Sequence, residues 1–349
     1  MTSWISKITH CALPIAAAAS FATPGLTQGA STQWSQNPVA DWIGGNTRFA
    51  MDLSYRGTLP SVTGKPMGLG AIGFDFHHVV SSASRDIGTV TAQGYLLRFD
   101  NANTRPGFVE GPDDWDWTWR ILTFNYTALT DGWLNIKAGH LEMPYGLEWI
   151  FDSNGTLRDY QLGPNLGIKA DWGVSANGVL KNFEYEVSVT RGLGMEIRDI
   201  GDSYAICGRI GTPSDRQLVV GLSGFHGEVI SPGPLVNRTR FGIDVQRQLG
   251  AWTLLGELSV GDDNDDSRTQ AIAELNWVNN DESLMIYLQD VGRWRESSGK
   301  TDSQNRIALG AQYRPDNNWD LSTELRQDLE TLPGAERAFT LVAQVRYRF

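Results

Sequence analysis

The chain ends in Ala338-Phe339-Thr340-Leu341-Val342-Ala343-Gln344-Val345-Arg346-Tyr347-Arg348-Phe349, and this stretch decides the fold. Its residues alternate between two chemical faces. A period of two indicates a β-strand, because successive side chains of a strand point to opposite sides. An apolar face directed outward, arginines directed inward and an aromatic last residue are typical of a strand in a transmembrane β-barrel. The apolar face carries Phe339, Leu341, Ala343, Val345, Tyr347 and Phe349, and the other carries Thr340, Val342, Gln344, Arg346 and Arg348.

The same alternation recurs back along the chain from about Thr47. Each segment is long enough to cross a bilayer when tilted, and the number of segments is even, as in bacterial outer-membrane barrels. The sequence therefore predicts an all-β fold, a 16-stranded antiparallel transmembrane β-barrel of the outer-membrane porin type over residues 47–349. The predicted strands are 47–57, 67–80, 87–100, 116–128, 132–143, 166–176, 182–192, 203–212, 216–227, 237–248, 251–260, 268–279, 283–292, 304–315, 319–330 and 338–349.

The connections between these segments alternate in length, as in barrels with short periplasmic turns and longer outer loops. Short turns are predicted near 130–132, 249–250, 279–281 and 315–318. Longer loops are predicted at 101–115, 144–165, 193–202, 228–236, 261–267, 293–303 and 331–337. Two soluble β-sandwiches would also contain alternating strands, but they do not require this regular alternation of short and long connections.

Tryptophan follows the same pattern. Trp133, Trp252 and Trp319 each come directly after a short turn, and Trp277 comes just before one. Tryptophan rings prefer the interface between membrane and water. The short turns are therefore predicted to lie at one membrane surface.

Composition excludes other classes of protein. The 349 residues include 29 Lys and Arg against 40 Asp and Glu, a net charge of −11, whereas nucleic-acid binding needs a basic surface. Beyond the N-terminus no run of about 18 consecutive apolar residues occurs, so no transmembrane helix is predicted. The only cysteines, Cys11 and Cys207, cannot supply a disulfide framework.

Residues 1–30 are predicted to be a secretory signal peptide. Lys7 supplies a weak positive region and an apolar stretch follows, with cleavage predicted after Ala22 or Ala30. Residues 31–46 would then form a short periplasmic N-terminal segment, and the protein would reside in the bacterial outer membrane. A disordered N-terminal extension is the alternative interpretation.

The strand pattern directs many charged side chains into the barrel, because a charge facing lipid at mid-depth would cost roughly 2–4 kcal/mol. Sixteen strands also leave an aqueous channel. The lumen is therefore predicted to be wet and of mixed charge, with a modest basic excess. The basic lumen-lining residues are predicted to be Arg48, Arg56, Lys137, Lys169, Arg209, Arg240, Arg306, Arg326, Arg346 and Arg348.

The loop from Pro144 to Tyr160 is the candidate for narrowing this channel. It contains the apolar run Trp149-Ile150-Phe151, which would be unfavourable at an exposed loop tip. Folding against the inner wall would bury that run and form a pore constriction, with ion selection by facing charges. The constriction residues are predicted to be Glu148, Asp152, Arg158 and Asp159. The alternative is an outer loop that packs on its neighbours or on lipopolysaccharide.

The remaining motifs do not predict a metal-binding or catalytic site. The acidic run 261–266 lacks the spacing of an EF-hand, and a solvated loop is preferred over a weak cation contact. The segment Gly221-Leu222-Ser223-Gly224 matches only half of a nucleophile elbow. The chain is therefore predicted not to be an enzyme, and neither a cofactor nor a metal site is predicted.

The segment from Ala138 to Glu148 contains Gly139, Pro144, Tyr145, Gly146 and Glu148 at the spacing G-x-x-x-x-P-[FY]-G-x-E. In this it resembles the phosphate-selective porin family of the O/P type. The resemblance implies a sixteen-stranded outer-membrane channel for anions that is usually trimeric.

The sequence is compatible with three functions. The first is a porin for passive diffusion of small polar or anionic solutes or ions. The second is a barrel that sheathes a periplasmic cytochrome in an electron conduit, and the third is a plugged surface barrel. The expected partners are outer-membrane lipid and lipopolysaccharide, with a homotrimer as a further expectation and no nucleic acid.

Overall fold

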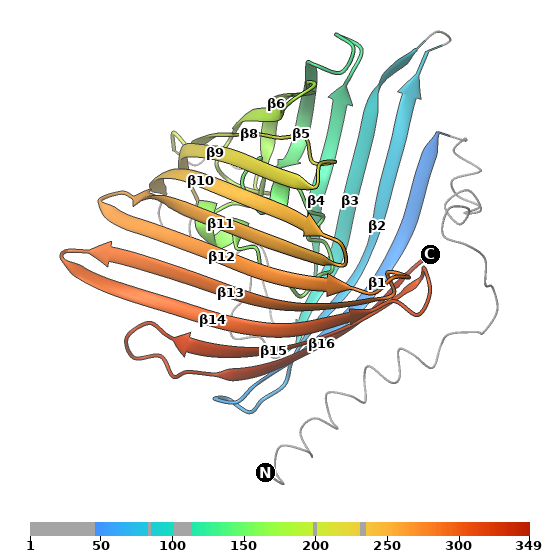
Figure 1. Cartoon of the computed structure of the whole chain (residues 1–349). Coiled ribbons are helices and arrows are strands. Elements are labelled where there is room, and N and C mark those ends of the chain that lie inside the picture. The colour runs from blue at the N-terminus through green and yellow to red at the C-terminus, as the bar shows by residue number, and fades with distance from the viewer. Residues whose placement is uncertain (1–45, 83–84, 101–113, 198–200, 231–234) are drawn as a thin grey trace.

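A computed structural model describes residues 46–82, 85–100, 114–197, 201–230 and 235–349 (Figure 1). The predicted signal peptide, nearly all of the segment 31–46 and most of the predicted loop 101–115 lie outside these ranges. Within them, sixteen strands form one closed barrel in which every strand is antiparallel to its neighbours and β1 pairs with β16. The strands are β1 Thr47–Pro60, β2 Met67–Ser81, β3 Asp86–Asp100, β4 Trp115–Tyr126, β5 Asn135–Glu142, β6 Ala170–Val179, β7 Glu184–Thr190, β8 Tyr204–Gly211, β9 Leu218–Val229, β10 Val236–Leu249, β11 Trp252–Asp263, β12 Asp266–Val278, β13 Leu284–Ser297, β14 Lys300–Tyr313, β15 Trp319–Glu330 and β16 Phe339–Arg348.

The predicted 16-stranded antiparallel barrel is confirmed, and each predicted strand overlaps an observed one. Closure removes the unpaired edges that an open sheet would expose. The join is made by the first and last strands, with Arg56 opposite Gln344 and Thr58 opposite Val342. Among the described residues, no helix is both long enough and apolar enough to cross a membrane.

Two predicted long loops are instead tight hairpins. β11 and β12 are joined by Asn264 and Asp265, and β13 and β14 by Ser298 and Gly299. Asn264, Ser298 and Gly299 have positive φ values of 51°, 52° and 74°, as two-residue hairpin turns require. The predictions of loops at 261–267 and 293–303 were therefore wrong, because the polar residues there extend the strands beyond the apolar band.

The outward surface of the barrel is apolar. Its exposed side chains include Phe241 and Leu222, which are 64% and 58% exposed. In a soluble protein such a surface would be buried, because each large apolar side chain gains about 1.5–3 kcal/mol when it leaves water. Trp133 and Trp252 are also exposed and lie at the end of the barrel that carries the β4–β5 and β10–β11 turns.

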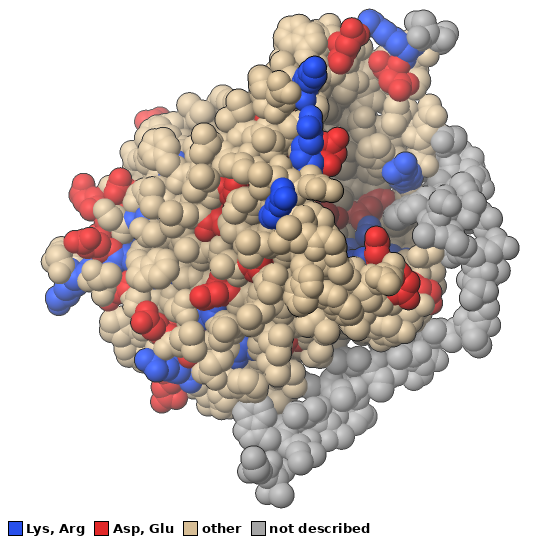
Figure 2. Space-filling view, viewed as in Figure 1, with Lys and Arg blue, Asp and Glu red and all other residues tan. Residues whose placement is uncertain are grey.

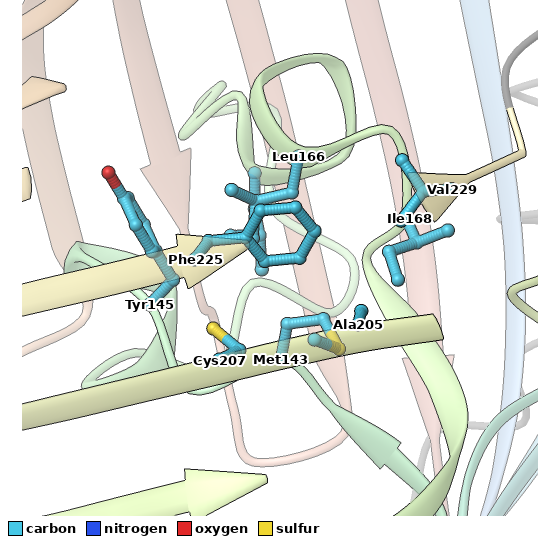
Figure 3. Packing of buried hydrophobic residues seen from close by; sticks show 9 residues of the cluster. Met143, Tyr145, Leu166, Ile168, Ala205, Cys207, Phe225 and Val229 are labelled. Carbon is cyan, nitrogen blue, oxygen red and sulfur yellow. The ribbon is translucent and has the colours of Figure 1, made fainter. Parts of the chain in front are cut away.

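The hydrophobic core lies inside the barrel, where the segment between β5 and β6 packs on the wall. This segment contains a 3₁₀ turn, η2 Leu147–Trp149, and a short helix, α3 Leu162–Leu166. One cluster joins it to β8 and β9, and Figure 3 shows most of these side chains. The cluster consists of Met143, Tyr145, Leu162, Leu166, Ile168, Ala205, Cys207, Phe225 and Val229. A second cluster contains Leu147, Tyr160, Leu255 and Ile272.

Candidate functional site

The candidate site is the inward segment 143–169 together with the wall residues that hold it. We divide this segment into a loop tip, residues 152–158, and a loop root, residues 143–151 and 159–169. The root carries the two hydrophobic clusters described above. The tip is polar except for Leu157 and reaches strands on the other side of the barrel.

The root is positioned by hydrogen bonds as well as by apolar packing. The backbone N–H groups of Gly146 and Leu147 donate to Ser223 Oγ at 3.0 Å and to Glu257 Oε2 at 2.8 Å. Gly146 has a φ of 60°, and a Cβ at this position would lie 2.2 Å from Glu257 Oε2. Only glycine therefore allows the root to lie this close to β11.

Tyr145 adds a contact from the root to the wall. Its hydroxyl lies 2.6 Å from Ser259 Oγ. Burial raises the pKa of the Tyr145 phenol above its ordinary value, so the hydroxyl stays protonated at neutral pH.

The loop tip is held by the wall formed by β15, β16 and β1. Four backbone carbonyl oxygens of the tip accept hydrogen bonds from wall side chains, at distances of 2.5 to 3.0 Å. The donor and acceptor pairs are Arg346 to Asn154, Gln344 to Gly155, Arg56 to Thr156 and Arg326 to Leu157.

The opposite side of the tip meets β3 and β4. The guanidinium of Arg120 lies 3.0 Å from Asp152 and 2.7 Å from Glu142. The Asn154 side-chain amide donates to the Tyr95 hydroxyl. Because the tip bonds to this part of the wall while the root packs on β8, β9, β11 and β12, the inward segment bridges the lumen.

Arg120 was missed by the sequence analysis. The register between β3 and β4 shifts between Gln93 and Gly94, so that Gln93 pairs with Ile121 and Gly94 with Trp119. Such a bulge inserts one residue and redirects side chains. The signal in the sequence is the end of strict alternation after Trp115, Trp117 and Trp119, where Arg120 interrupts the pattern.

The four predicted constriction residues occupy different environments. Glu148 is buried in the root, where its carboxylate contacts Lys169 Nζ at 2.6 Å and accepts from the Leu162 N–H at 3.0 Å. Arg158 pairs with Glu274 at 3.1 Å. Asp152 remains 58% exposed despite its contact with Arg120.

Asp159 is the fourth predicted constriction residue and is the first residue of the root after the tip. Its backbone N–H donates to Gln289 Oε1 at 3.0 Å, which joins the loop to β13. Its side chain is partly exposed. Asp152 and Asp159 are thus the two of the four with accessible side chains of negative charge.

Nearly all of the ten predicted basic lumen residues carry a carboxylate partner. Arg48 is exposed at the start of β1, and Arg56 hydrogen-bonds to neutral oxygens of Gln344 and Thr156. The other eight form ion pairs, so the expected basic excess is largely neutralised. These pairs are Lys137–Glu186, Lys169–Glu148, Arg209–Asp244, Arg240–Asp263, Arg306–Asp328, Arg326–Glu324, Arg346–Asp52 and Arg348–Asp75.

The pair between Arg209 and Asp244 is the most deeply buried of these. Both side chains are 0% exposed, and the atoms lie 2.6 Å apart. The Trp149 ring of the loop root lies over the guanidinium, with 4.9 Å between its carbon and the ring centroid. Trp149 of the root therefore covers the guanidinium of this ion pair.

The acidic run at 261–266 also has a structural role. Asp263 lies within 3.0 Å of the guanidinium groups of Arg238, Arg240 and Arg268. Because these residues belong to β10, β11 and β12, the carboxylate ties three strands together. The run thus consists of two paired strand ends joined by the Asn264–Asp265 turn, not of the solvated loop that was preferred from the sequence.

The interior is accessible at one side of the inward segment. Figure 2 shows that the molecule is hollowed over β2 and β3 and that side chains of both charges lie in the hollow. The arrangement is therefore a barrel with a bridging loop and a charge-balanced interior.

No protein-family model and no curated protein matches this sequence. Solved structures do match it. OprB of Pseudomonas putida has 10% identity and a TM-score of 0.65, over 87% of this chain and 94% of that chain. An anion-selective porin from Comamonas acidovorans has 12% identity and a TM-score of 0.61, over 87% and 99%. The outer-membrane protein OmpT of Vibrio cholerae, in a trimer form, has 11% identity and a TM-score of 0.61, over 87% and 99%. At these identities the likeness establishes the fold, which is that of outer-membrane porins.

Proposed function

We propose that this chain is a channel of a bacterial outer membrane through which small polar or anionic solutes diffuse. The observation that carries the proposal is the polarity of the closed barrel, which is apolar outside and lined by ion pairs inside. This arrangement suits lipid on the outer surface and water within. The predicted leader at residues 1–30 would direct export.

The inward segment would form the constriction. In this proposal Asp152 and Asp159 expose carboxylates to passing solutes, whereas Glu148 and Arg158 hold the loop in shape. Charges in a narrow, partly dehydrated passage act on ions more strongly than charges in bulk water. Selectivity would therefore depend on few residues.

Most of the residues that carry the resemblance to phosphate-selective porins lie in the loop root. Its motif residues Tyr145, Gly146 and Glu148 all contact the wall or the rest of the loop. We infer that the motif specifies how the loop enters the barrel. Anion preference would come from guanidinium groups elsewhere in the lumen, and the likeness to an anion-selective porin supports that preference.

The structure also bears on the competing functions. A loop that bridges the lumen favours a plugged barrel over a sheath, since an inserted cytochrome would have to displace the bridging loop. A homotrimer is proposed by analogy with the trimer form of the Vibrio cholerae protein.

Planar-bilayer recordings of the purified protein test the proposed function. We expect steady single-channel conductance, with ion selectivity measured at two pH values. Liposome swelling with sugars of graded size would give the size limit. A barrel that inserts but passes neither ions nor sugars would establish the plugged alternative, and copurification with a haem protein would support the sheath.

A further inference from the structure

The contact line between the loop tip and the β15–β16–β1 wall contains an unusual concentration of positive charge. Arg56, Arg326 and Arg346 each donate to a backbone carbonyl of the tip. Arg346 also pairs with Asp52, and Arg326 with Glu324. Three guanidinium groups thus share two carboxylates.

Arg56 is the one of the three that forms no ion pair among the described residues, although Glu324 acts on its charge at longer range. Its two hydrogen bonds, each 3.0 Å long, go to the side-chain oxygen of Gln344 and the carbonyl oxygen of Thr156, both of which are neutral. An ionised oxygen would add Coulomb attraction to the guanidinium charge, which these neutral oxygens do not supply. The tip therefore occupies positions that an anionic oxygen would fill better.

The tip is shaped around these guanidinium groups. Gly155 has a φ of 74°, and a Cβ there would lie 2.1 Å from a guanidinium nitrogen of Arg346. The neighbouring Asn154 and Thr156 turn their carbonyls to the same wall. The carbonyl oxygens of the tip thus accept the hydrogen bonds that the oxygens of a bound anion would accept.

We propose that this contact line is a binding site for a small oxyanion, a carboxylate or a phosphate, and that the bound anion releases the loop tip from the wall. The proposal rests on the proposed channel function, which brings the anion to the site. Arg56 and Arg326 are partly exposed and can be reached from the lumen. The root remains in place, because its apolar clusters lie on β8, β9, β11 and β12.

Two thiols allow the tip and the root to be followed in one protein. Leu157 of the tip is 3% exposed, so L157C introduces a thiol that is protected while the tip is bound. Cys207 lies beneath the root, buried in the first cluster, and serves as the internal reference. Peptide mass spectrometry after treatment with a thiol reagent separates the two positions.

The expected result is faster labelling at position 157 in sodium phosphate than in sodium chloride of equal ionic strength and pH. A hydrogen bond to a charged group is worth enough to change the open fraction by about tenfold or more. Cys207 should stay unlabelled. An equal labelling rate in both salts, or a parallel rise at Cys207, would overturn the proposal. Sodium acetate in a third sample distinguishes carboxylate from phosphate.

Substitution of Arg56 identifies the group that responds. In R56Q labelling of L157C should already be about tenfold faster in chloride, with no further rise in phosphate. R306Q is the matched control, since Arg306 faces inward, pairs with Asp328 and forms no bond to the described residues of the loop. If the labelling rate at position 157 rises from chloride to phosphate as much in R56Q as in R306Q, the proposed site is refuted. Should L157C not fold, T156C reports on the same tip.

The labelling result is independent of conductance. If labelling changes as expected but the protein passes no current, the anion site is supported and the proposed channel function is refuted. If the protein conducts but its labelling rate is the same in phosphate, acetate and chloride, the channel function is supported and the anion site is refuted.

Discussion

Two walls of one barrel hold the same loop in opposite ways. The wall of β8–β12 holds the root through apolar clusters and through the Arg209 guanidinium, which is buried with Asp244 beneath the Trp149 ring. The wall of β15, β16 and β1 holds the tip through guanidinium groups that donate to backbone oxygens. Separating the root would expose buried apolar side chains, whereas partly exposed groups of the second attachment, such as Arg56 and Arg326, can also bond to water.

The largest effect is expected from the buried ion pair. In D244N the Arg209 guanidinium keeps its burial but loses its counter-charge, which should reduce the free energy of unfolding by about 3–5 kcal/mol. Denaturant unfolding in detergent measures the loss. The control is D328N, whose partner Arg306 is 42% exposed and whose expected loss is about 0–1 kcal/mol. Equal losses in the two variants would show that the two walls do not differ.

The root should respond to loss of a buried side chain. L166A removes a fully buried residue of the first cluster, with an expected cost of about 2–5 kcal/mol in the free energy of unfolding. It should also make Cys207 reactive to thiol reagents, because the thiol lies in the same cluster.

The comparison for L166A is T156A in the tip. Thr156 is partly exposed and its carbonyl, not its side chain, meets Arg56, so stability should change by about 0.5 kcal/mol or less. Protected Cys207 in both variants would mean that the cluster does not hold the root.

A small change in stability and a clear change in conduction are expected at Asp152. Its carboxylate is mostly exposed, so D152N should alter stability by about 0–1 kcal/mol. Loss of one charge about 7 Å from a passing ion in water removes about 0.6 kcal/mol, or roughly a threefold change in relative permeability. Reversal potentials in a salt gradient should therefore shift toward anions.

Asp215 provides the matched control for that measurement. It lies in the turn between β8 and β9, where its side chain is 85% exposed. D215N changes the net charge equally but should leave the reversal potential unchanged. A shift of equal size in both variants would place selectivity in the overall charge of the protein.

Much of the fold could be predicted because a strand with one face in lipid needs an alternating sequence. The terminal strand from Phe339 to Arg348 shows this, since its inward Arg346 and outward Tyr347 follow from the period alone. The hairpins at Asn264 and Ser298 could not be separated from loops. Beyond the apolar band a polar strand and a polar loop have similar compositions.

The candidate site was less predictable. The apolar run at Trp149 predicts that the loop between β5 and β6 packs against another surface, but it does not identify that surface. Arg120 was hidden because a bulge depends on the pairing of β3 with β4. The count of inward arginines suggested free positive charge, whereas long-range pairs such as Arg346 with Asp52 neutralise it.

The sequence by itself determined that this chain forms sixteen alternating strands with aromatic residues near their ends, because alternation is a local consequence of two different surroundings. Only the tertiary structure decided which charges cancel and where the loop binds. Those contacts join residues as distant as Arg56 and Gln344, whose proximity exists only once the barrel has closed. In the closed barrel Arg56 donates hydrogen bonds to neutral oxygens only. Arg56 is the residue at which we propose that the anion binds.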